Sequence, residues 1–303
     1  MVTLEVRHET HYRYAAPVAQ ALHLAWLQPL HDERQSLLAH ELQIEPTPPE
    51  RLQQIDGFGN RRVFFGLSRP HRALSVCSSS RVQLVPRAPD LDGASGGAWE
   101  VLRDRLRYAA GARFEPAVEF VQPSPFIPRL AELRAYAAAS FPPGRPPAQG
   151  AIELMRRIHE DFRYETASTG VDTPLALAFA QKRGVCQDFA HVMIGALRML
   201  GLPARYVSGY LLTEPPTGSA PLVGADASHA WVQAYCPGVV ADGWLDLDPT
   251  NAVIPDTGHV RLAIGRDYGD VTPLRGVIRG GGEHTLDVRV QTRQVEPARM
   301  LLE

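Results

Sequence analysis

The spacing of apolar residues changes twice along this chain, and the two changes limit the folds that it can adopt. Over residues 1–85 apolar and polar residues alternate, as in Thr3–Thr10 and Glu41–Glu45, which is the period of a half-buried strand. Between residues 99 and 200 the apolar residues recur every three or four positions, which predicts helices with one buried face. From Ala204 the alternation returns. Strands, then helices, then more strands predict an α+β fold.

A segment of linker composition separates the first strands from the helices. Residues 86–97 are rich in Pro, Gly and Asp, which is typical of a domain boundary. We therefore expect a sandwich-like antiparallel β domain over residues 1–90 and a core of helices packed on an antiparallel sheet over residues 91–303. The alternating segment 285–292 is expected to return to the first domain and pair there, which would bring the chain ends close.

The most regular helical pattern begins beside a cysteine. Apolar residues recur from Phe189 to Leu200, and Gly201 followed by Pro203 ends the helix. Cys186 therefore lies in the first turn, where unpaired N–H groups and the helix dipole favour a thiolate. The same N–H groups can face an oxyanion that forms on a carbonyl attacked by the sulfur. On this segment alone, a cysteine that only fills core space is an equal alternative.

A histidine and two aspartates on the following strands can complete a catalytic group. His229 begins one predicted strand, while Asp246 and Asp248 share one face of the next. A short turn near Pro237 would pair these strands antiparallel and bring His229 beside a carboxylate, facing the Cys186 helix. A cysteine nucleophile needs such a base and such an acid. Alternatively, Asp248 only caps a turn, or the three residue types bind zinc, although no paired Cys-x-x-Cys or His-x-His is present.

Composition excludes several classes of protein. The 303 residues are 45% hydrophobic and 21% charged with a net charge of −2, so neither a nucleic acid nor an anionic membrane surface is expected as partner. No run is long and apolar enough to span a bilayer, and the first residues lack the apolar centre of a signal peptide. With three cysteines, too few for a disulfide framework, the expected compartment is the cytoplasm. No metal-ligand spacing or calcium loop occurs, so no cofactor is expected.

Several motifs, in this order, resemble those of bacterial transglutaminase-like proteins. In the core they are Gly-Val-Cys-Gln-Asp-Phe-Ala-His at 184–191, Gly-Leu-Pro-Ala-Arg-Tyr-Val-Ser-Gly-Tyr at 201–210, Ser-His-Ala-Trp-Val at 228–232, Gly-Trp-Leu-Asp-Leu-Asp-Pro-Thr-Asn at 243–251 and Gly-Arg-Asp-Tyr-Gly-Asp-Val-Thr-Pro-Leu-Arg-Gly at 265–276. Residues 8–14 and 56–60 resemble the N-terminal region that often precedes this core. The resemblance implies a papain-like fold with a Cys186–His229–Asp248 triad, and leaves Asp246 as a non-catalytic neighbour.

From these residues we expect a cysteine-dependent enzyme that acts on an amide of a peptide or protein through a thioester on Cys186. Hydrolysis is expected first, because water is always available; transamidation is the second outcome. A non-catalytic binding module is the alternative from a different class. Tyr164, Gln187 and Trp231 are candidate contacts to the oxyanion or the substrate, and Tyr164 is singled out because related cores place a donor upstream of the cysteine.

Overall fold

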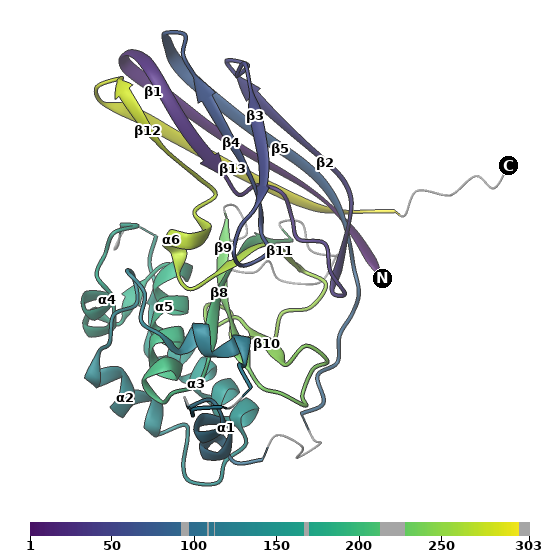
Figure 1. Ribbon diagram of the computed structural model, residues 1–303, viewed down its shortest axis with the longest axis vertical. Coiled ribbons are helices and arrows are strands. Elements are labelled where there is room, and N and C mark those ends of the chain that lie inside the picture. Colours follow the sequence, from purple (N-terminus) through teal and green to yellow (C-terminus); the bar gives the residue numbers. More distant parts are fainter. Residues whose placement is uncertain (92–96, 108, 112, 167–169, 213–227, 297–303) are drawn as a thin grey trace, which may run out of the picture.

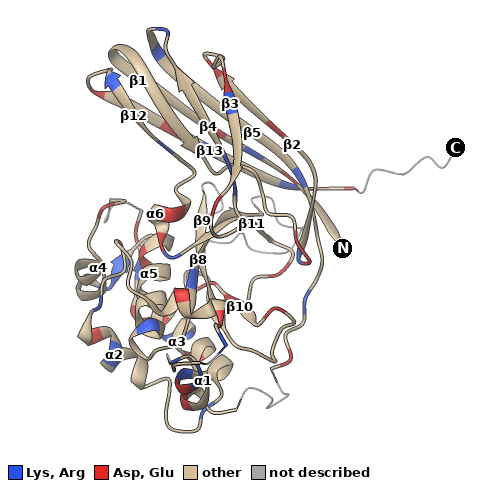
Figure 2. Cartoon of the chain, viewed as in Figure 1, with Lys and Arg blue, Asp and Glu red and all other residues tan. Residues whose placement is uncertain are grey.

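The computed structural model describes residues 1–303 except 92–96, 108, 112, 167–169, 213–227 and 297–303. Long strands form one end of the molecule, and at the other end helices pack against a small sheet (Figure 1). The predicted α+β class is therefore confirmed. Acidic and basic residues are interspersed along both parts of the ribbon (Figure 2). Among the described residues, no helix is long and apolar enough to cross a membrane.

The strand end of the molecule is one antiparallel sheet of seven strands. The long strand β1 (Val2–Ala25) lies at its centre, with the order β2-β5-β1-β4-β3 and with β12 and β13 also paired to β1. The other strands are β2 (Gln35–Glu45), β3 (Arg51–Ile55), β4 (Arg61–Leu67), β5 (His71–Leu84), β12 (Leu274–Gly280) and β13 (His284–Val295). The segment 285–292 thus lies in β13, which pairs with β1 from Thr3↔Val295 to Tyr14↔His284.

This sheet folds back over itself, so it forms two layers without being two sheets. The first half of β1 pairs with β5 and with β13. Its second half pairs with β4 and with β12. At the end of the sheet far from the helices β1 turns back on itself, and loops join neighbouring strands there (Figure 1). At this bend Gly280, Gly281 and Gly282 all have positive φ, and a Cβ on Gly280 would lie 2.6 Å from the Pro17 carbonyl oxygen. Residues of both layers share one buried cluster, which includes Tyr14, Ile44, Leu74, Val76, Ala21, Val63, Phe65 and Leu67.

The second sheet has the order β10-β9-β8-β11 and is antiparallel throughout. Its strands are β8 (Ala204–Leu211), β9 (His229–Tyr235), β10 (Trp244–Leu247) and β11 (His259–Gly265). The helices are α1 (Trp99–Arg105), the 3₁₀ helix η2 (Pro116–Val121), α2 (Ala131–Ala138), α3 (Pro147–Asp161), α4 (Leu175–Gln181), α5 (Cys186–Met199) and α6 (Tyr268–Val271). The two-residue strands β6 (Arg163–Tyr164) and β7 (Arg183–Gly184) form a short parallel pair. The loop predicted at 214–221 lies outside the described residues.

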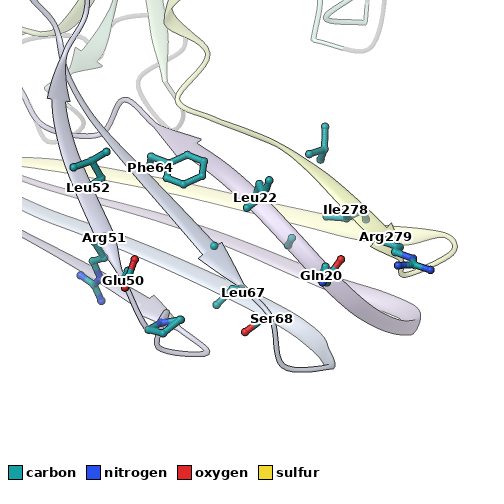
Figure 3. Close-up of a pocket in the computed structure, with 14 residues that line it drawn as sticks. Gln20, Leu22, Glu50, Arg51, Leu52, Phe64, Leu67, Ser68, Ile278 and Arg279 are labelled. Atoms are coloured by element: carbon teal, nitrogen blue, oxygen red, sulfur yellow. The ribbon is translucent and has the colours of Figure 1, made fainter.

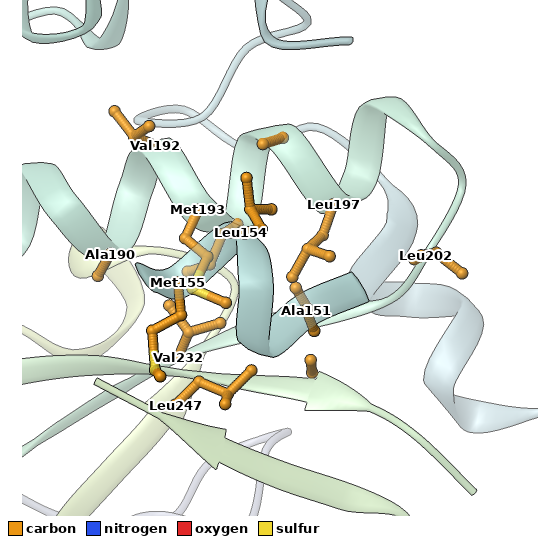
Figure 4. Close-up of a cluster of buried hydrophobic side chains, with 14 of the residues drawn as sticks. Ala151, Leu154, Met155, Ala190, Val192, Met193, Leu197, Leu202, Val232 and Leu247 are labelled. Carbon is orange, nitrogen blue, oxygen red and sulfur yellow. The ribbon is translucent and has the colours of Figure 1, made fainter. Parts of the chain in front are cut away.

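Helix α5 is the centre of the main hydrophobic core. Its apolar positions are buried, as their spacing predicted, and α3 contributes side chains from one side and the second sheet from another. Figure 4 shows Met193 and Leu197 of α5 near Leu154 of α3 and Val232 of β9. Because α5 is held along its length, the position of its first residue is fixed.

The two parts of the molecule are joined by two buried carboxamides at the edge of β11. The Gln35 side chain donates to the Arg261 carbonyl at 2.7 Å and accepts from the Arg261 N–H at 2.8 Å. Asn60 makes the equivalent pair of hydrogen bonds with Ile264, both at 2.7 Å. These side chains satisfy backbone groups of a strand edge, which otherwise needs covering. Beneath them one apolar cluster is shared by Leu4, Val6, Val82 and Leu84 of the first sheet and Tyr210, Val260 and Leu262 of the second.

The contact between β8 and β9 requires a glycine. Gly209 lies opposite His229, and a Cβ at this position would meet the Val260 carbonyl oxygen and the Trp231 ring. Because one obstacle is backbone, we expect Gly209→Ala to lower the free energy of unfolding by about 3 kcal/mol, measured by urea denaturation. Gly57→Ala is the control, because a Cβ there would have nothing within 4 Å. Equal losses in the two variants would contradict the packing described here.

Candidate active site

The start of α5 is built around a short-range contact between Gly184 and Asp188. Val185 is the extended N-cap residue, and its N–H donates to the Asp188 carboxylate at 2.8 Å. A Cβ on Gly184 would lie 2.7 Å from the Asp188 Cβ, so glycine here permits a close approach. This contact fixes the first turn, and Cys186 is the first residue of the helix, partly exposed.

His229 and Asp248 form a buried ion pair. The β9 and β10 strands pair antiparallel from Trp244↔Tyr235 to Leu247↔Val232, so the residue that begins β9 lies beside the residue that follows β10. His229 Nε2 is 2.9 Å from Asp248 Oδ2, and both side chains are fully buried. Asp248 also accepts hydrogen bonds from the backbone N–H groups of Thr250 at 2.9 Å and Asn251 at 3.2 Å, from Asn251 Nδ2 at 2.8 Å, and from His259 Nε2 at 3.2 Å.

These contacts hold Asp248 ionised. Burial alone raises the pKa of a carboxyl group, but His229 and His259 keep the pKa of Asp248 well below its usual range. For His229 burial acts to lower the pKa, yet the charges of Asp248 and Cys186 outweigh it and raise the pKa to about 10. Because Nε2 is directed to Asp248, Nδ1 is the ring nitrogen left for the Cys186 thiol. The arrangement therefore favours a charged imidazole next to Cys186.

Asp246, the aspartate within β10, has different partners. Asp246 Oδ1 accepts from the Trp231 indole N–H at 2.9 Å, and Asp246 Oδ2 pairs with Arg34. The two aspartates, which strand alternation could not tell apart, thus have separate contacts, and it is Asp248 that accepts the hydrogen bond from His229.

The other three predicted contacts lie around α5 and β9. Tyr164 is half-buried, pairs with Gly184 in the β6–β7 ladder, and its ring lies 6.3 Å from that of Phe189. Gln187 is buried and donates to the Val171 carbonyl at 3.0 Å. Trp231 is fully buried and stacks on His229 with ring centroids 6.2 Å apart. Trp231 therefore packs behind the imidazole, and its side chain is closed off from the surface.

A pocket on the first sheet is separate from Cys186, His229 and Asp248. A groove of about 890 Å³ lies on the first sheet, with Leu22, Leu52, Phe64 and Arg279 among its lining residues (Figure 3). None of its lining residues comes from α5, β9 or β10. Within the described part of the chain, no group of three or more His, Cys, Asp and Glu side chains could hold a metal ion.

The three cysteines should differ strongly in reactivity. Cys236 is buried, which raises its pKa to about 12, and Cys77 lies within β5, away from any helix N-terminus. At neutral pH we expect iodoacetamide to modify Cys186 more than about tenfold faster than either of the others, measured by peptide mass spectrometry. Equal rates at Cys77 and Cys186 would show that the α5 terminus and His229 do not activate the thiol.

Known proteins resemble this chain over nearly its whole length. Residues 4–83 match the family model of the bacterial transglutaminase-like N-terminal region, and residues 134–249 match that of the transglutaminase-like superfamily. An uncharacterized protein of Mycobacterium tuberculosis is 40% identical over 291 residues, which cover 94% of this chain and 90% of that protein. A protein of Mycobacterium leprae, also uncharacterized, is 33% identical over 292 residues, covering 96% and 98%.

Two further similarities are more distant. A protein-glutamine gamma-glutamyltransferase of Pseudomonas aeruginosa is 38% identical over 115 residues, which cover 37% of this chain and 17% of that protein. The crystal structure of a candidate cysteine protease from Cytophaga hutchinsonii has a TM-score of 0.72 at 20% identity, covering 98% of this chain and 91% of that one. That structure shows a shared fold, and the mycobacterial relatives match both regions of the sequence together. The chain therefore belongs to the bacterial transglutaminase-like family.

Proposed function

We propose that this protein is a cysteine-dependent enzyme that cleaves an amide of a peptide or protein through a thioester on Cys186. The observation that carries the proposal is the buried His229–Asp248 pair beside a cysteine at the first position of α5. A histidine whose pKa is raised by both a carboxylate and a thiol is poised to hold the thiol proton. Because the three cysteines are free, we also propose that it acts in the cytoplasm.

In the first half of the reaction the sulfur replaces the amine. His229 takes the Cys186 proton, and the sulfur attacks the amide carbonyl carbon to give a tetrahedral oxyanion. When the C–N bond breaks, its electron pair stays on nitrogen, and the imidazolium of His229 supplies the proton that releases the amine. Asp248 keeps the imidazole oriented and stabilises its charged form throughout.

In the second half the acyl group leaves the enzyme. His229 takes a proton from water, the oxygen attacks the thioester carbonyl, and the C–S bond breaks to give a carboxylic acid and the Cys186 thiol. An incoming amine in place of water would give a new amide. We propose hydrolysis first, because water is always available. Transamidation is the second proposal, because the Pseudomonas relative is named as a glutamyltransferase.

The oxyanion needs hydrogen-bond donors, and the first is the backbone N–H of Cys186, which has no partner within its own helix. We propose the Tyr164 hydroxyl as the second, because β6 places Tyr164 beside Gly184. Tyr164→Phe keeps the ring and removes the hydroxyl, so turnover should fall more than about tenfold with little change in melting temperature. Unchanged turnover would exclude the hydroxyl from the mechanism.

The function is tested by supplying peptides that contain glutamine side chains and internal amide bonds, with and without the amine dansylcadaverine. Mass spectrometry then separates hydrolysis of the side-chain amide, cleavage of the backbone and incorporation of the amine. The proposal expects one of these products and an acyl adduct on Cys186, with both lost in Cys186→Ala and His229→Ala. Binding of peptides without any Cys186-dependent product would instead favour a non-catalytic module.

A further inference from the structure

We propose that Arg34, from the N-terminal part of the chain, is a positioning residue for the active site. In this proposal Arg34 holds Asp246, and Asp246 holds the Trp231 indole against the imidazole of His229. The inference rests on the proposed function, because it takes His229 as the catalytic base. It adds a role for the N-terminal region in the chemistry, although that region supplies no member of the triad.

The first link is a buried cation at the start of β10. Arg34 lies between β1 and β2 and is only 7% exposed. Its guanidinium donates to the two carboxylate oxygens of Asp242 at 2.7 and 2.8 Å, and it also contacts Asp246 and the carbonyl of Trp244. Arginine stays protonated even when buried and offers donors in a rigid plane, so it fixes these three acceptors relative to the first sheet.

The second link runs from Asp246 to the imidazole. The Trp231 indole donates to Asp246 at 2.9 Å, and Trp231 is 0% exposed. Its ring is inclined by 26° to that of His229 and meets the His259 ring edge-on, with centroids 5.3 Å apart. Both histidines bond to Asp248. The indole is therefore packed against both imidazoles of this group, and any displacement of Trp231 changes the space that they occupy.

Loss of Arg34 would disturb this arrangement for an electrostatic reason. Asp246 is buried, and a buried carboxylate without its cation is strongly unfavourable. Asp246 would then take up a proton or draw in water, and the Trp231 N–H would lose a charged acceptor fixed in space. The imidazole of His229 would be less well oriented toward Cys186 and less able to take the proton of its thiol.

The rate at which iodoacetamide alkylates Cys186, measured from pH 5 to pH 9, tests this without a known substrate. We expect Arg34→Ala to slow alkylation about tenfold near pH 6 and to move the midpoint of the pH profile upward. Arg34→Lys, which keeps the charge, should recover part of the loss. Arg293→Ala removes an exposed arginine of the first sheet, which pairs with Glu5 at 2.9 Å, and should leave the profile unchanged.

A double substitution tests the route through the indole. Trp231→Phe keeps an aromatic ring behind His229 but removes the N–H that binds Asp246. If Arg34 acts through Trp231, adding Arg34→Ala to Trp231→Phe should slow alkylation no further than the single Trp231→Phe change. Losses that multiply in the double variant would overturn the proposal, because Arg34 would then act by another route.

The outcomes separate this inference from the proposed function. If Cys186 of the unaltered protein reacts no faster than Cys77 and His229→Ala has no effect, the proposed function fails. If Cys186 is activated but Arg34→Ala behaves like Arg293→Ala, only the positioning role fails. If Arg34→Ala does not fold, Asp246→Asn is used in its place, because that variant keeps the side-chain shape and an oxygen acceptor. A pH profile of Cys186 alkylation that Asp246→Asn leaves unchanged would overturn the positioning role of Arg34.

Discussion

Replacing Asp248 by asparagine is expected to lower turnover by about 10³–10⁴-fold, because a triad acid sets the tautomer of the histidine and stabilises its charged form. The matched control is Asp246→Asn, which makes the same chemical change two residues away on β10. Asp246 bonds to Trp231 and Arg34, so its replacement should cost only about tenfold. Steady-state turnover and Cys186 alkylation at pH 6 both report the difference.

Stability must be measured alongside activity in these variants. Asp248 is fully buried and accepts from His229, His259, Thr250 and Asn251, so Asp248→Asn is also expected to lower the melting temperature. Assays are therefore run well below the midpoint of unfolding. If Asp246→Asn proved the more damaging to turnover, the imidazole would be oriented from the Trp231 side, and the triad assigned here would be wrong.

Local patterns predicted the elements that carry the proposed nucleophile and base. The spacing of Phe189, Val192 and Met193 predicted that α5 is a helix, although the structure buries it on all sides, from Gln187 to Arg198, rather than on one face. The short turn after Tyr235 predicted the pairing of β9 with β10, since chain connectivity leaves few other arrangements. The fold class follows from the same periodicities.

Three features depend on contacts that periodicity does not encode. All residues of β11 are buried, the polar His259 and Arg261 included, so burial does not follow the polarity of the sequence there, and His259 was not predicted as part of the site. The pairing register of β1 with β5 shifts between Arg13 and Val18, which disturbs the alternation along β1. For this reason the sequence pattern did not predict the second half of β1 or the single folded sheet. Arg34 lies outside any periodic element, and its contact with Asp246, 212 positions away, exists only once both parts of the chain are folded.

Deleting residues 1–90 is expected to leave an insoluble fragment, even though Cys186, His229 and Asp248 all remain. The deletion removes β1, the only partner of β12 and β13 in the described sheet, so both strands would expose open edges. It also uncovers the apolar side chains of Tyr210, Val260 and Leu262, which now pack against the first sheet.

The edge of β11 would be exposed by the same deletion. Gln35 and Asn60 now satisfy the backbone N–H and carbonyl groups of Arg261 and Ile264. The combined substitution Gln35→Ala and Asn60→Ala in the full chain removes these four hydrogen bonds, together with those that the two side chains donate to the Leu30 carbonyl and to Asp56, each worth about 1 kcal/mol. That variant should be soluble but less stable, which separates the cost of the exposed edge from the cost of the exposed apolar surface.

Size-exclusion chromatography and the Cys186 alkylation rate give the decisive readouts for the fragment 91–303. We expect aggregation, with any soluble material alkylated at the rate of an ordinary thiol, because Arg34 and the cover of β11 are both missing. Adding residues 1–90 as a separate chain should restore solubility if the lost contacts are the cause. A monomeric fragment that reacts as fast as the full chain would show that the two parts fold independently and that the N-terminal region contributes nothing to the geometry at His229.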